Sequence, residues 1–225
     1  MTTALARRRY RLGLSLFLGS ARWLRWPLLC WIVLTPIASA VFIDAVDQGL
    51  WRIAASVFQW FVAATAGIWL ASNLPTLLAR GITRREITVA YLLFGLLASI
   101  ASVAITIGGF AAEHALLALT SEPLGTWGET LTIGLRYLLV TPVYFFAGAF
   151  IGAAAARFGD KGWFTVAVLV GSGALYVGLL ALEFGDLDGS GRLAAFLAGG
   201  IGATAALCVA TALALRSIPV RAKRA

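Results

Sequence analysis

Residues 84–114 read RREITVAYLLFGLLASIASVAITIGGFAAEH, and this stretch decides the fold class. Charged residues stand at both ends, whereas no Asp, Glu, Lys or Arg occurs from Ile87 to Ala112. A helix needs roughly 20 apolar residues to cross about 30 Å of hydrocarbon. The run is long enough, and it lacks the alternation that is typical of barrel strands. The stretch therefore predicts a transmembrane helix.

Five more apolar runs of similar length occur along the chain. With 60% hydrophobic and 12% charged residues, the 225-residue sequence is too apolar for an ordinary soluble domain. We expect an all-α polytopic membrane protein with six transmembrane helices. Besides Ile87–Ala112, the predicted spans are Pro27–Val46, Ile53–Ala79, Leu131–Ala156, Trp163–Leu182 and Leu193–Leu215.

The charges of successive loops predict the orientation. Fifteen of the 18 Lys and Arg residues fall on one side of the predicted spans, and eight of the ten Asp and Glu residues fall on the other. Because positively charged loops stay in the cytoplasm, both termini should be cytoplasmic, in a protein of the cell membrane. The basic residues sit in short loops beside the bilayer, so the net charge of +8 does not indicate nucleic-acid binding.

The chain before the first span predicts a separate interfacial helix. Arg8, Arg11, Arg22 and Arg25 share one helical face, while leucines and Trp23 occupy another. Such a helix buries its apolar face among headgroups of the inner leaflet. A cleavable signal peptide is the alternative, but the arginines that precede the full-length span favour retention. The expected organisation is an interfacial helix at 1–26, a membrane domain at 27–215 and a basic cytoplasmic tail at 216–225.

Catalytic and metal-binding patterns are missing from the sequence. It contains no G-x-x-x-x-G-K-[ST], H-E-x-x-H or G-x-S-x-G motif, so we expect neither an ATPase nor another enzyme, and no metal or cofactor bound by this chain. No carboxylate is expected near the middle of a span, which argues against ion coupling. His114 is expected to be exposed at the interface. Uncharged polar residues within spans can form hydrogen bonds between helices, which is the simpler interpretation, or a candidate substrate path: Gln59, Asn73, Thr141 and Tyr144.

Small residues predict close helix contacts. Gly148 and Gly152 form a GxxxG motif in the fourth span. Ala195, Gly199 and Ala203 repeat this spacing in the sixth span. Such motifs indicate packing of helices, not chemistry.

The link between the second and third spans carries the sharpest local signal. It reads ARGITRRE from Ala79 to Glu86. Thr83 and Glu86 fit a capping box, so a helix should begin at Arg84 directly after a turn at Gly81. This arrangement predicts a rigid basic elbow on the cytoplasmic side, and its simplest role would be to anchor the topology.

Two loops resemble those of a known family. The Ala79–Glu86 string is similar to the G-(V/I)-(S/T)-R link of type 2 ABC-transporter permeases, the membrane subunits of many bacterial exporters. The loop after the fourth span resembles the R-F-G loop of actinobacterial members. Six spans with inside termini and an N-terminal interfacial helix also match, so the resemblance covers nearly the whole chain. The matching residues of the second loop are Arg157, Phe158, Gly159, Asp160 and Lys161.

The resemblance implies a dimer of permeases, with a second copy or a paralogue, docked on two copies of a separate ABC ATPase that binds ATP and magnesium. The first link would form a coupling helix that inserts into the ATPase. One departure is the short outer loop between the fifth and sixth spans, where many members place re-entrant helices. The implied coupling residues are Gly81, Ile82, Thr83, Arg84, Arg85 and Glu86.

Three functional hypotheses follow. The first is the membrane-spanning permease subunit of an ATP-binding-cassette exporter. The second is an ion-coupled secondary transporter, which would need a coupling-ion site. The third is a membrane scaffold or immunity protein that transports nothing. The apolar path would suit a lipid, a peptide or a hydrophobic drug.

Overall fold

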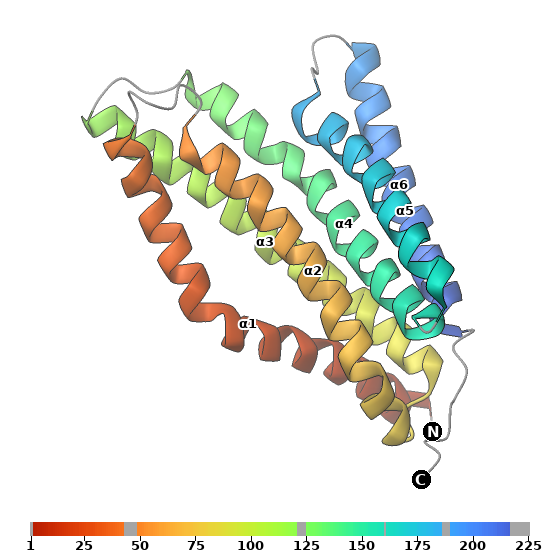
Figure 1. Cartoon of the computed structure of the whole chain (residues 1–225). Coiled ribbons are helices and arrows are strands. Elements are labelled where there is room, and N and C mark those ends of the chain that lie inside the picture. Colours follow the sequence, from red (N-terminus) through yellow and green to blue (C-terminus); the bar gives the residue numbers. More distant parts are fainter. Residues whose placement is uncertain (1, 43–48, 121–124, 160, 186–189, 217–225) are drawn as a thin grey trace.

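A computed structural model describes residues 2–42, 49–120, 125–159, 161–185 and 190–216. Within these residues the chain forms helices only, and six of them are long and apolar enough to cross a membrane. This confirms the all-α polytopic prediction (Figure 1). The helices are α1 (Thr2–Val41), α2 (Leu50–Ala79), α3 (Arg84–Thr120), α4 (Trp127–Phe158), α5 (Gly162–Phe184) and α6 (Ser190–Arg216).

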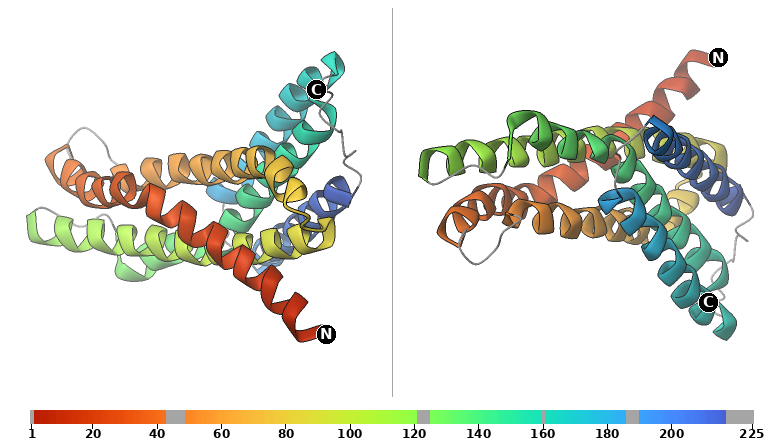
Figure 2. Two further views of the ribbon diagram at one scale, coloured as in Figure 1. Left: turned by 90° about the horizontal axis from the view of Figure 1, so that it is seen from below. Right: turned by 90° about the horizontal axis from the view of Figure 1, so that it is seen from above.

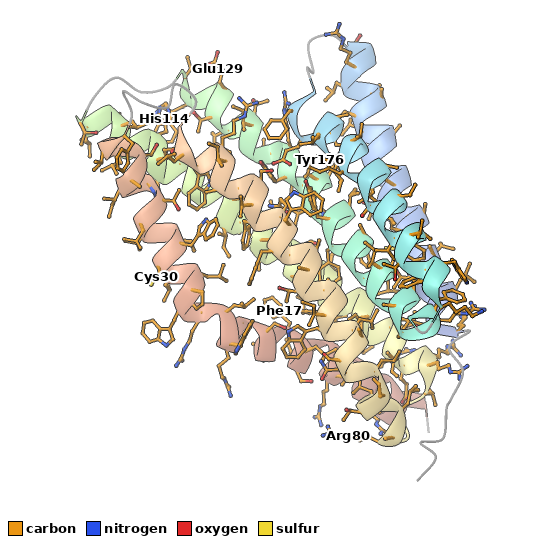
Figure 3. The ribbon with its side chains drawn as sticks, in the orientation of Figure 1. Phe17, Cys30, Arg80, His114, Glu129 and Tyr176 are labelled. Atoms are coloured by element: carbon orange, nitrogen blue, oxygen red, sulfur yellow. The ribbon has the colours of Figure 1, made fainter. Side chains whose placement is uncertain are left out.

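The expected interfacial helix and the first span belong to one continuous helix, α1. It bends between Phe17 on one arm and Cys30 on the other (Figure 3). Pro27 lies in this interval; it has no N–H to donate and its ring crowds the carbonyl of Trp23, so it accounts for the bend. In the first arm, Gly13 lies so close to α3 that a β-carbon there would be 2.7 Å from the Ala90 carbonyl oxygen.

The centre of the bundle is built from α2, α3 and α4. Gly148 and Gly152 of α4 lie directly against the backbone of Ala63 and Gly67 of α2, where added β-carbons would collide with main-chain oxygens. The predicted GxxxG contact is therefore present, and its partner is a small-residue pair on α2. Gly199 of α6, in contrast, has no neighbour within 4 Å of its β-carbon position, whereas Ala203 of the same motif packs against apolar core residues.

The remaining helices surround this centre. Figure 2 shows α1 running obliquely across α2 and α3, while α5 and α6 flank α4. Most side chains of α5 are exposed, and Leu179 and Glu183 are its buried residues within the described part. Apolar side chains on these outer surfaces, such as Val170 and Val177, suit contact with lipid.

Side chains from two other helices hold the start of α2. Gly49 precedes α2 without a side chain that could cap it. The backbone N–H of Trp51 donates instead to Glu113 of α3, at 2.8 Å, and that of Leu50 donates to Ser39 of α1, at 3.1 Å. A carboxylate satisfies the free N–H groups and the positive end of the helix dipole. These contacts tie α1, α2 and α3 together at this end.

The predicted spans Ile87–Ala112 and Leu131–Ala156 leave a long outer segment between them, and this segment is largely helical in the structure. Helix α3 continues to Thr120 and α4 already begins at Trp127. Thr126 and Glu129 form a second capping box at the start of α4. His114 is also buried, not exposed as predicted: Thr130 lies 3.1 Å from its Nδ1, and its ring packs on Trp127.

Candidate functional site

The link between α2 and α3 has the predicted geometry. Gly81 adopts a φ of +72°, a left-handed conformation that suits glycine and turns the chain after α2. Thr83 donates its backbone N–H to the Glu86 carboxylate at 2.9 Å, and Glu86 donates its own N–H to the Thr83 hydroxyl at 3.3 Å. This reciprocal pair is the predicted capping box, and α3 begins at Arg84. The elbow is therefore ordered by its own residues.

The elbow is fixed to the bundle on one side and exposed on the other. Ile82 is half-buried and packs against the core formed by α2, α3 and α4. Arg84 donates a hydrogen bond of 2.7 Å to the backbone oxygen of Arg216 at the end of α6. Arg80 and Arg85 are exposed, and Arg80 lies at the lower tip of the bundle in Figure 3. The free basic surface of the elbow thus comes from Arg80 and Arg85.

The second predicted link lies at the same end of the bundle, where α4 turns into α5 (Figure 1). Phe158 is half-buried, with the Arg157 guanidinium 4.6 Å and the Lys161 ammonium 5.6 Å from its ring centre. Both distances are within cation–π range. Gly159 ends α4 by donating to the Ala155 oxygen at 2.9 Å. Asp160 lies outside the described residues.

The four residues of the predicted substrate path do not meet at one place. Asn73 lies 14 positions after Gln59 on α2, roughly 21 Å along the helix, and bonds to the Trp69 oxygen of its own helix. Gln59 is fully buried and donates to Thr106 of α3 at 3.4 Å. Thr141 is fully buried as well, and its hydroxyl has no hydrogen-bond partner among the described residues. Tyr144 lines a cavity between α2, α4 and α5.

A polar cluster at Glu183 was not predicted, because this residue falls just outside the predicted span Trp163–Leu182. Glu183 is only 5% exposed. Its carboxylate accepts hydrogen bonds from Tyr137 at 2.7 Å, Tyr144 at 3.2 Å and Ser56 at 3.3 Å. Three helices, α2, α4 and α5, therefore meet at one carboxylate. We call Glu183, Tyr137, Tyr144 and Ser56 the Glu183 cluster.

The Glu183 cluster lies beside the apolar part of α4. Tyr137 and Tyr144 stand about two and four turns inside the predicted span from Leu131 to Ala156. Glu183 stands at the end of α5, so no carboxylate of the described residues lies near the middle of a span, yet this carboxylate is buried against the side of α4. The seven-residue spacing of the two tyrosines places both on one face of α4, and this signal was available in the sequence.

Two arginines lie near the cluster. The Arg52 guanidinium is 5.2 Å from the centre of the Phe184 ring, and its charge acts on Glu183. Arg136 donates a hydrogen bond of 2.7 Å to the Gly185 oxygen, where it caps the end of α5. This bond holds Arg136 against the end of α5.

A slot of about 380 Å³ opens between α2, α4 and α5, next to the cluster. Ala63, Gly67, Gly148 and Gly152 form its floor, and Leu175 and Leu179 of α5 form one wall. Tyr144 is shared between the slot and the cluster. The volume falls in the range of sites for small organic ligands.

Neither a metal site among the described residues nor a similar known protein indicates the function. Among the described residues, no three His, Cys, Asp or Glu side chains come together to hold a metal ion. No family model matches the chain, and no curated protein or solved structure is significantly similar to it. Its function is inferred from the residues and their geometry.

Proposed function

We propose that the chain is the membrane-spanning permease subunit of an ATP-binding-cassette exporter in the cell membrane. A partner chain supplies ATP hydrolysis, and a second permease, identical or paralogous, completes the transporter. Both termini and the two links lie on the cytoplasmic side. Two features support this proposal: the chain has six helices that can cross a membrane, and its sequence contains no G-x-x-x-x-G-K-[ST] motif for binding a nucleotide.

One observation carries the proposal: the elbow is rigid and presents exposed basic residues. The Gly81 turn, the Thr83–Glu86 capping box and the Arg84–Arg216 bond fix its shape without a partner. A docking partner that moves would therefore move α2 and α3 together, since the elbow joins their ends directly. The link from Arg157 to Lys161 adds a basic and aromatic surface at the same end of the bundle.

A pull-down tests the proposal. The wild-type protein is compared with a variant carrying Arg80→Ala and Arg85→Ala, which removes the exposed charges but keeps the Arg84 bond. Arg192→Ala, at the opposite end of the bundle, is the matched control. We expect an ABC ATPase to be recovered with the wild type and the control, and lost with the double variant. Failure to recover any such ATPase with intact, monodisperse wild type would contradict the proposal.

The Glu183 cluster favours a second candidate, an ion-coupled secondary transporter. Buried carboxylates within membrane bundles commonly serve ion or proton pathways. Substrate flux in vesicles distinguishes the two candidates: flux driven by an ion gradient without ATP supports the second, whereas flux that needs the partner ATPase and ATP supports the first.

A further inference from the structure

The slot between α2, α4 and α5 combines an apolar floor with an open side. Ala63, Gly67, Gly148 and Gly152 bring the backbones of α2 and α4 into contact, so no large side chain fills the space above them. Leu175 and Leu179 close the side formed by α5. Exposed residues such as Ile68 stand at the rim, so a ligand would enter from the lipid. The slot thus suits the apolar body of a small molecule.

Trp60 and Tyr144 line the slot at its end nearest the Glu183 cluster, and Tyr176 packs against Trp60 outside this lining. The ring centres of Trp60 and Tyr144 are 5.2 Å apart, with the planes at 86°. Those of Trp60 and Tyr176 are 5.5 Å apart, with the planes at 49°. Because the planes differ, the faces of the rings point in several directions. Trp60 and Tyr176 remain 37% and 44% exposed, so part of each side chain is accessible to a ligand.

The order of residues along α2 places the Glu183 carboxylate nearer to the slot than the Arg52 guanidinium. Arg52, Ser56 and Trp60 follow one another at intervals of four residues and so share a face of α2. Ser56 bonds to the Glu183 carboxylate, Arg52 lies one turn toward the start of the helix, and Trp60 lies one turn toward the slot. Glu183 does not line the slot itself, but it stands one turn beyond the slot residue Leu179 on α5, so its carboxylate lies just past the end of the slot and the arginine lies farther away.

From this geometry we infer that the slot binds a lipophilic organic cation taken from the bilayer. Its apolar body fills the space over Gly67 and Gly148, and its cationic head lies against Trp60, with the Tyr176 ring next to it and the Glu183 carboxylate about one helical turn away. Aromatic faces attract cations, and the attraction is stronger where water is excluded. The inference rests on the proposed function only in treating this ligand as a transported substrate, because binding requires no ATPase.

The test compares two probes of nearly equal shape and opposite charge. Equilibrium binding of tetraphenylphosphonium and of tetraphenylborate is measured on the full chain in nanodiscs of neutral phosphatidylcholine, with empty discs subtracted. We expect saturable binding of the cation and at least tenfold weaker binding of the anion. Equal binding of the two ions would overturn the inference and leave an apolar slot that accepts a lipid chain.

Variants locate the binding. Glu183→Gln should weaken cation binding about tenfold, because it removes the charge but keeps the side-chain shape. Ala64→Trp should abolish binding, since Ala64 is exposed within the slot. Glu113→Gln, a buried carboxylate elsewhere, and Ala104→Trp, an exposed alanine outside the slot, are the controls. Unchanged binding in Glu183→Gln and Ala64→Trp would overturn the inference.

A further variant covers the case in which Glu183→Gln does not fold. Tyr176→Leu removes an exposed ring without touching the Glu183 cluster, and it should weaken cation binding several-fold. Tyr10→Leu, which changes an exposed tyrosine on α1, should not alter binding. If Tyr176→Leu binds the cation as tightly as the wild type, the Tyr176 ring does not take part in binding. Failure to recover any ABC ATPase with the wild type, together with intact cation binding, would overturn the exporter function but not the site.

Discussion

The guanidinium of Arg84 donates a 2.7 Å hydrogen bond to the backbone oxygen of Arg216, across 132 residues of sequence. The bond joins the start of α3 to the last residue of α6. A cation at this position satisfies a free carbonyl and opposes the negative end of the helix dipole. Adjacent arginines in the same basic link therefore have different roles: Arg84 holds the fold, and Arg85 is exposed.

Arg84→Ala should lower the free energy of unfolding by about 1 kcal/mol, since one charge-assisted hydrogen bond is lost at a partly exposed site. Hydrogen exchange should also become faster in the last turn of α6. Arg85→Ala is the matched control and should change stability by less than about 0.5 kcal/mol. Equal effects of the two variants, by thermal unfolding in detergent, would contradict the assignment.

Gly148→Ala should strongly destabilise the bundle, by about 2 kcal/mol or more, because its β-carbon would collide with the Ala63 backbone. Gly171→Ala on α5 is the control, since no atom lies within 4 Å of its β-carbon position. That change should be neutral or slightly stabilising, in line with helix propensity. Unfolding by steric trapping in bicelles measures both. Similar stability of the two variants would show that α2 and α4 do not touch at Gly148.

Tyr137→Phe should lower the free energy of unfolding by about 1–3 kcal/mol. The change removes the hydroxyl that donates a 2.7 Å hydrogen bond to the buried Glu183 carboxylate. In a double-mutant cycle with Glu183→Gln, the two changes should be non-additive by about 1 kcal/mol. Tyr91→Phe is the control, since the buried Tyr91 hydroxyl has no hydrogen-bond partner among the described residues. That variant should keep or gain stability. Additive effects of Tyr137→Phe and Glu183→Gln would contradict a direct bond.

Gly81→Ala should destabilise the elbow by about 1 kcal/mol, because a β-carbon is disfavoured at a φ of +72° even where space is free. Gly108→Ala, in the middle of α3 and likewise without close neighbours, should be neutral or stabilising. Thermal unfolding of the two variants measures the difference. A Gly81→Ala protein as stable as Gly108→Ala would show that the turn does not need a left-handed residue.

Cysteine labelling tests the orientation. In a background with Cys30→Ser and Cys208→Ser, Arg85→Cys should react with a membrane-impermeant maleimide only after cells are permeabilised. Thr126→Cys, exposed at the opposite end of the bundle, should react in intact cells. This expectation follows from the distribution of basic residues. The reverse pattern would place the elbow outside the cell and remove the basis for an ATPase contact.

The sequence by itself determined what depends on neighbours along one helix. Apolar runs predicted six membrane helices, the Thr83–Glu86 spacing predicted the start of α3, and Gly148 with Gly152 predicted a close contact. The capping box and the GxxxG motif each involve residues three or four positions apart, and a span is recognised from one continuous apolar run. Each can therefore be detected from a single segment of sequence. Helix α3 continues to Thr120, beyond the predicted span that ends at Ala112, and α4 begins at Trp127, before the predicted span that starts at Leu131. The apolar pattern of each segment weakens before its helix ends.

Only the tertiary structure decided which polar groups meet. Glu113 and Glu183 look alike in the sequence as acidic residues near the ends of spans. Packing turns the first toward the free N–H groups of α2 and the second toward Tyr137 and Tyr144. The rotation and tilt of each helix fix these contacts, and they result from the packing of all helices together. A slot with an apolar floor and a carboxylate at its end is therefore a property of the assembled bundle.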